Sequence, residues 1–195
     1  MDFTLVCCLL ISGLGVARAL PGGAPAKACA ALLPMHTGIS PSTETVPYTF
    51  TFSQSTYTPG KAITVTITTS NEQQYPIAGF LLQGRRTQGN TGTSVGTFSN
   101  PTGKTKLLTC NTAGDSFTHS AAEARGKTVQ ITWNPPSSDA GNIVIRGTVA
   151  ASKKVFFGVL NSSEITYVKP STGTATGPAA LLIFVISSVM AILFL

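Results

Sequence analysis

The segment Ala62-Ile63-Thr64-Val65-Thr66-Ile67-Thr68 alternates apolar residues with threonine from Ile63 onward. Successive side chains of a β-strand point to opposite faces of a sheet, so the alternation predicts a strand with Ile63, Val65 and Ile67 on its buried face. The same pattern recurs over residues 48–52 and 127–133. The chain is therefore expected to form sheets that are buried on one face.

Further strands are predicted on either side of these three segments. They cover residues 77–83, the end of 92–98, 142–149, 154–160 and 164–168. Turn residues separate them, for example Tyr57-Thr58-Pro59-Gly60 and Asn134-Pro135-Pro136. No convincing amphipathic helix is present. About eight short strands with such turns predict an all-β fold, an antiparallel immunoglobulin-like β-sandwich, with Trp133 as an anchor of its core.

Both ends of the chain carry processing signals. Residues 5–16 are apolar and lead into Ala17-Arg18-Ala19, which predicts a secretory signal peptide over 1–19, with a membrane anchor as the alternative. Residues 179–195 are almost wholly apolar and follow a small polar stretch. This favours a glycosylphosphatidylinositol (GPI) signal over 171–195, attached at Ser171, rather than a single-pass type I helix. The expected domain is 20–170, on the extracellular face of the plasma membrane.

Two cysteines remain once the predicted signal peptide is removed. Cys29 and Cys110 form an even pair in an oxidising compartment, so a disulfide is the default expectation. A metal or catalytic thiol pair is the alternative, but the sequence has no CxxC spacing to support it. The same secretory route makes Asn161-Ser162-Ser163 a glycosylation sequon, which predicts a glycan on Asn161.

Charge is basic and sparse, with 13 Lys+Arg against 7 Asp+Glu. If the basic side chains converge, they would hold an anionic glycan or a microbial surface; otherwise they are scattered solvated charges. The candidates are Arg85, Arg86, Lys104, Lys106, Lys153 and Lys154. Basic residues are not interleaved with aromatics in a stripe, so nucleic acid is not an expected partner.

Motifs for catalysis are missing from the sequence. Thr102-Gly103-Lys104-Thr105 lacks the earlier glycine of a phosphate-binding loop, because Phe98 occupies that position. His36 and His119 are too few for a metal site and are expected to be structural or surface residues. A disulfide would bring their two segments together, which leaves a contact between them open. A non-enzyme without cofactor or metal is predicted.

An ordered set of short motifs resembles the reeler domain family. The motifs are Cys29, Pro34-Met35-His36, Pro47-Tyr48, Gly79-Phe80-Leu81-Leu82-Gln83, Gly96-Thr97-Phe98, Cys110, Thr118-His119-Ser120 and Val129 to Pro135. The resemblance implies an immunoglobulin-like sandwich and a Cys29–Cys110 bridge. This chain departs from many relatives in lacking further cysteines and in having Phe156-Phe157 where an aromatic pair with Trp is frequent.

The resemblance also implies extracellular binding rather than catalysis. Relatives that are reductases carry their redox groups outside this module, so reductase activity is not expected here. The expected function is a lipid-anchored surface binding module with a role in innate defence. The alternative is a cell–matrix or cell–cell adhesion module that binds glycosaminoglycan or protein ligands.

Overall fold

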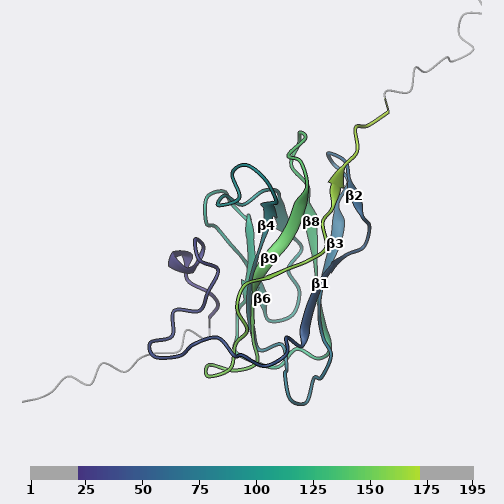
Figure 1. Cartoon of the computed structure of the whole chain (residues 1–195). Helices are drawn as coiled ribbons and strands as arrows, with labels where there is room; N and C mark the ends of the chain where they lie inside the picture. Colours follow the sequence, from purple (N-terminus) through teal and green to yellow (C-terminus); the bar gives the residue numbers. More distant parts are fainter. Residues whose placement is uncertain (1–21, 172–195) are drawn as a thin grey trace, which may run out of the picture.

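Two antiparallel β-sheets face each other in the computed structural model, which describes residues 22–171 (Figure 1). The first sheet has the order β1 (Tyr48–Phe52), β3 (Ile63–Thr69), β8 (Thr128–Asn134) and β5 (Thr97–Ser99). The second has the order β10 (Leu160–Asn161), β9 (Ile143–Ala150), β4 (Gly79–Arg86), β7 (Ser116–His119) and β6 (Thr105–Leu108). The predicted all-β sandwich is confirmed.

Strand β3 is an inner strand of the first sheet, and the face predicted to be buried is buried. It pairs with β1 on one side and with β8 on the other, and Val65 lies opposite Ile131 in β8. Ile63, Val65 and Ile67 are buried, and the threonines between them face outward or are partly covered. Cross-strand pairs of β-branched residues stabilise such a sheet through their packing.

Trp133 is the centre of the core between the sheets, as the sequence predicts. Its side chain is fully buried and its ring contacts Phe52 and Tyr57, with ring centroids 5.7 and 6.2 Å apart. Gly96 lies against the ring with φ +68°, and a Cβ there would come within 2.7 Å of it. Only glycine therefore combines this backbone conformation with so close an approach.

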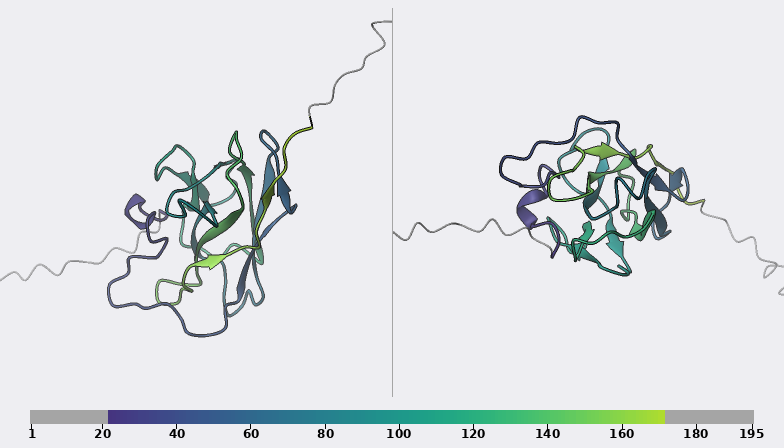
Figure 2. Two further views of the ribbon diagram at one scale, coloured as in Figure 1. Left: turned by 45° about the horizontal axis from the view of Figure 1, so that its top comes forward. Right: turned by 90° about the horizontal axis from the view of Figure 1, so that it is seen from below.

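Strand β4 is covered on both faces, which explains the continuous apolar run of the strand predicted over residues 77–83. Leu82 of β4 packs in the main core, whereas its neighbour Leu81 packs with Ala28 and Leu32 in a separate cluster. Residues 22–36, drawn in purple in Figures 1 and 2, lie outside the sandwich and supply that second cover. The outer face of β4 is thus buried by a segment from the start of the described chain.

The prediction of a strand over residues 154–160 is wrong. The backbone there bonds to loops and to the end of β9 rather than to one partner strand: Ser42 N–H donates to Phe156 O, and Phe157 N–H donates to Val149 O. Phe156 and Phe157 are both buried, and Phe157 belongs to the main core. The apolar run therefore reflects burial of a crossing segment, and only β10 at its end forms a ladder.

Three short strands were not predicted from the sequence. β6 and β7 pair with each other at the edge of the second sheet, and β2 (Thr56–Tyr57) pairs with β11 (Thr166–Tyr167) in parallel. β2 lies at the start of the predicted turn Tyr57-Thr58-Pro59-Gly60, where Lys61 N–H donates to Thr58 O. These strands have two to four residues, too few for a periodic pattern to stand out.

Helical structure within residues 22–171 is limited to the 3₁₀ turn η1 (Ala26–Ala28). Over the same residues, no helix has the length and apolar character needed to cross a bilayer. The predicted signal peptide over 1–19 and the apolar tail over 179–195 lie outside the described residues. Both stay predictions.

Candidate functional site

A pocket of about 330 Å³ lies between residues 23–36 and the end of the second sheet where β4 begins and β9 ends. The segment is tied down by the Cys29–Cys110 disulfide, whose Cα atoms are 5.8 Å apart, and this confirms the predicted bridge. Ala24 N–H donates to Thr118 Oγ1 at 3.1 Å. Leu32 packs against Leu81. Residues 23–36 thus form a strap that the disulfide holds over one face of the second sheet, and the pocket lies beneath this strap.

The walls of the pocket are mainly apolar, and the titratable side chains among them are two lysines and two histidines. Its lining has no carboxylate. The lining residues are Gly23, Ala24, Pro25, Lys27, Ala28, Leu32, Leu33, Pro34, Met35, His36, Ala78, Gly79, Phe80, Leu81, His119, Ala122, Thr148, Ala150, Ser152 and Lys153. Such a mixture suits an occupant with an apolar body and a negative end.

Arg85 links the strap to the second sheet through hydrogen bonds. It is buried on the outer face of β4, and its guanidinium donates to Gln83 Oε1 at 2.8 Å, Thr91 O at 3.1 Å and Cys29 O at 3.0 Å. Burial lowers its pKa, the charge of Arg146 lowers it further, and Asp115 opposes both. The predicted ligand contact at Arg85 is thus replaced by a structural role inside the fold.

Asp115 holds the loop that carries Cys110. Its carboxylate accepts bonds from the N–H groups of Cys110, Asn111 and Thr112 at 2.8–2.9 Å and from Ser94 Oγ at 2.7 Å. Burial alone would raise its pKa, but these donors stabilise the ionised form and leave the pKa below its ordinary value. The carboxylate therefore positions the cysteine on the sheet side of the bridge.

The two histidines line the same pocket but bind different partners. His36 Nδ1–H donates to Lys153 O at 2.8 Å, and its ring meets Phe156 edge-on. Phe80 N–H donates to His119 Nδ1 at 3.1 Å. Burial lowers the pKa of His119. The Phe80 carbonyl, as an acceptor for the protonated ring, raises this pKa, and the charges of Arg125 and Lys106 lower it. Among the described residues no group of three metal-ligating side chains is found.

Thr148 lies on the floor of the pocket with an unsatisfied hydroxyl. The residue is 3% exposed, and Oγ1 has no hydrogen-bond partner within the described part of the chain. Thr148 pairs with Leu81 across β9 and β4. A buried hydroxyl without a partner costs about 1–3 kcal/mol, so this position is not optimised for stability alone.

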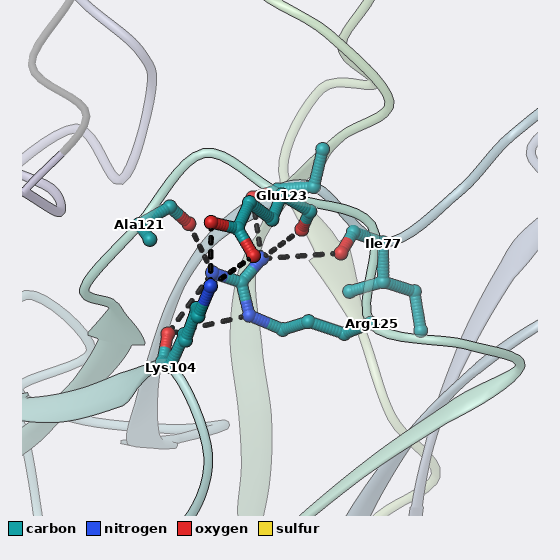
Figure 3. A network of polar contacts seen from close by, with 6 residues as sticks. Ile77, Lys104, Ala121, Glu123 and Arg125 are labelled. Carbon is teal, nitrogen blue, oxygen red and sulfur yellow. Dashed lines mark hydrogen bonds and ion pairs between the residues drawn. The ribbon is translucent and has the colours of Figure 1, made fainter.

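Arg125 is the centre of a network of polar contacts (Figure 3), next to Ala78 and Phe80 of the pocket lining. Its guanidinium donates to the carbonyls of Ile77, Ala78, Lys104, Ala121 and Glu123. It also lies over the Phe80 ring, 5.7 Å from the centroid. Burial lowers its pKa and Glu123 opposes the shift. The five acceptors come from three separate loops, so this side chain joins them.

The six basic residues predicted to contact an anionic ligand do not form one patch. Arg86 lies near Tyr57, at the other end of β4 from the pocket, which is about 23 Å along a strand of this length. Lys104 forms an exposed ion pair with Glu123 at 2.5 Å. Lys153 lines the pocket, and exposed Lys154 follows it in the chain.

Lys106 and Lys27 complete the charge around the pocket. Lys106 lies against Gly23, since a Cβ on that glycine would be 3.2 Å from Lys106 Nζ. Lys27, in η1, is exposed at the rim and was not singled out from the sequence. A single lysine carries no pattern of its own, and only the fold of residues 23–36 places it on the same pocket as Lys153.

The predicted modification sites are at the surface. Asn161 is exposed in the edge strand β10, opposite Arg146 of β9. Ser171 is exposed and is the last described residue. Glycosylation and lipid attachment at these residues stay predictions.

Comparison with known proteins identifies relatives of two kinds. The sequence model of the Reeler domain matches residues 27–173. A Bombyx mori protein named "Putative defense protein" is 30% identical, over 82% of this chain and 92% of that protein. A Danio rerio protein named "Putative ferric-chelate reductase 1" is also 30% identical, over 89% of this chain but only 30% of that protein. The crystal structure of the human F-spondin reeler domain has a TM-score of 0.53 at 15% identity, covering 68% of this chain and 96% of that domain.

Proposed function

Because this chain belongs to the Reeler domain family, we propose that it is a non-catalytic binding module that acts in defence at the cell surface. The observation that carries the proposal is the match to the Bombyx mori defence protein, which extends over 92% of that protein. The match to the Danio rerio reductase covers 30% of its length, so reductase activity of the whole protein is not transferred.

The proposed target is an anionic microbial surface. Support comes from the net charge of +6 and from Lys27, Lys106 and Lys153 around one pocket. Clustered cations raise the local concentration of an anionic partner and speed its association, and added salt weakens this effect. Lys104, in an exposed ion pair with Glu123, is not among the residues that line the pocket.

Binding to bacterial envelopes tests this proposal. The protein is expressed from the whole chain in animal cells, released from intact cells with a phosphatidylinositol-specific phospholipase, and purified without detergent. Binding to lipopolysaccharide-bearing vesicles is measured at physiological salt for the native protein and for Lys106→Glu with Lys153→Glu. The matched control is Lys61→Glu with Lys127→Glu, two exposed lysines outside the pocket. The pocket pair should weaken binding about tenfold and the control pair by less than threefold.

Absence of vesicle binding by the native protein at physiological salt would contradict the defence proposal. Binding to heparin or to a matrix protein, without any binding to bacterial envelopes, would favour the adhesion alternative instead.

The proposed place of action is the outer face of the plasma membrane, through a GPI lipid on Ser171. The small polar residues after Ser171 and the apolar run over 179–195 support this proposal. Treatment of intact cells with a phosphatidylinositol-specific phospholipase should release the protein, with a new C-terminus at Ser171 on mass analysis. Protein that stays bound and keeps Leu195 would instead be a type I membrane protein.

A further inference from the structure

We propose that the pocket between the strap and the second sheet binds a single-chain amphiphile with an anionic head, its acyl chain inside and its head at Lys27. The inference rests on the proposed function, because it names the ligand class of the same surface. A fatty-acid carboxylate is the simplest probe of this chemistry.

The size and lining of the pocket favour an acyl chain. A volume of about 330 Å³ is at the lower end of the range of about 300–1,000 Å³ for small-molecule sites. Leu32, Leu33, Phe80 and Leu81 contribute apolar surface to the walls. Met35 continues this surface outward and is 59% exposed. The apolar surface therefore extends from the interior outward to Met35.

The charge around the entrance favours a negative head. Lys27 and Lys153 line the pocket together with both histidines, and no Asp or Glu is among the lining residues. Lys106 lies against Gly23 and Arg125 lies over the Phe80 ring, so two further cations adjoin the lining of the pocket. Exposed ion pairs contribute little energy, so the head sets preference while the buried chain supplies most of the affinity.

A glycan or a peptide fits the same pocket less well. Sugar hydroxyls or peptide groups placed against leucine, phenylalanine and alanine would lose several hydrogen bonds to water, and the single Thr148 hydroxyl on the floor replaces few of them. Strand addition is also blocked here, because β4 already pairs with β9 on one side and β7 on the other. A methylene chain has no such groups to satisfy.

Calorimetric titration with octanoate, decanoate and dodecanoate, each below its micelle concentration, tests the proposal on the phospholipase-released, detergent-free protein. Binding should be one to one. Each methylene that enters the pocket should tighten binding about fourfold. Decanol, which has the same chain as decanoate without the charge, should bind several-fold more weakly.

Two variants separate the chain from the head. Ala150 lines the pocket beside Gly79, so Ala150→Phe should fill it and weaken every ligand by at least about tenfold. Its control is Ala62→Phe at an exposed site. Lys27→Glu should weaken decanoate about threefold to tenfold and leave decanol unchanged, and Lys61→Glu should change neither.

Thermal unfolding of each variant shows whether it folds. If Ala150→Phe does not fold, the chain-length series and the Lys27→Glu comparison still test the proposal. Binding that is independent of chain length, or a Lys27→Glu effect that is equal for decanoate and decanol, overturns the proposal. If the protein binds bacterial vesicles but no fatty acid, the pocket inference fails alone. If it binds neither, the proposed function fails as well.

Discussion

Removal of the Cys29–Cys110 disulfide should be among the most destabilising changes that leave the core intact. The bridge joins residues 81 positions apart. In the chain-entropy relation, opening a loop of that length returns about 15 cal/mol/K to the unfolded chain, or about 4.5 kcal/mol at 25 °C. For a domain of this size, that loss corresponds to a fall in melting temperature of about 9–18 °C.

The assay is equilibrium unfolding of the Cys29→Ala, Cys110→Ala double variant in guanidinium chloride, followed by the fluorescence of Trp133. This tryptophan is fully buried and is the single one in the chain, so its emission reports global unfolding. The matched control is the native protein with its disulfide reduced and alkylated under native conditions. Both should lose a similar free energy of unfolding, because both lose the same constraint on the unfolded chain.

A second measurement follows the strap alone. Without the bridge, residues 23–36 are still held by the Arg85 bond to Cys29 O and by Leu32 against Leu81. Breaking these few contacts costs less free energy than unfolding the sandwich, so proteolysis should cut the strap before the sandwich unfolds. A loss of free energy below about 1 kcal/mol, with no change in strap cleavage, would refute the chain-entropy reasoning and show that the folded contacts alone position the segment.

Three further changes test the core and its polar supports. Gly96→Ala should cost about 2 kcal/mol more free energy of unfolding in guanidinium than Gly89→Ala. Both glycines have φ near +70°, but only Gly96 lies against the Trp133 ring. Equal losses of free energy in the two variants would contradict this steric argument. Arg125→Met should cost about 3 kcal/mol in thermal unfolding, since five carbonyls lose their donor, and a neutral result would show that water replaces the guanidinium. The pKa of Asp115 is lowered from 3.8, so the unfolded chain binds its proton first, and stability should be complete above that value and fall as the pH drops below it. Asp115→Asn should remove this part of the acid dependence, and an unchanged pH profile would refute the assignment.

The strand pattern of the first sheet could be predicted because it depends on a local property. Ile63, Val65 and Ile67 alternate with threonine, and a period of two places them on one face in any sheet. The same local argument failed over residues 154–160, where Phe156 and Phe157 are buried by different neighbours without a regular ladder. Hydrophobicity there indicated burial correctly and strand pairing incorrectly.

The candidate site could be predicted only in part. The basic residues could be identified in the sequence, but not where in the fold each side chain would lie. Arg85 and Arg86 are adjacent, yet Arg85 is buried under the strap and Arg86 lies at the far end of β4 from the pocket. Thr148 and Lys27 have no distinguishing pattern, and their importance arises from the pocket that surrounds them.

The sequence by itself determined that the protein is an all-β sandwich, which strand faces are buried in the first sheet, and which two cysteines pair. Each of these follows from local alternation or from counting the cysteines that remain. Only the tertiary structure decided that residues 23–36 cross the outer face of β4 and leave a pocket there. That outcome depends on contacts between segments some 50 to 120 residues apart, such as Leu32 with Leu81 and His36 with Lys153, which no local pattern encodes.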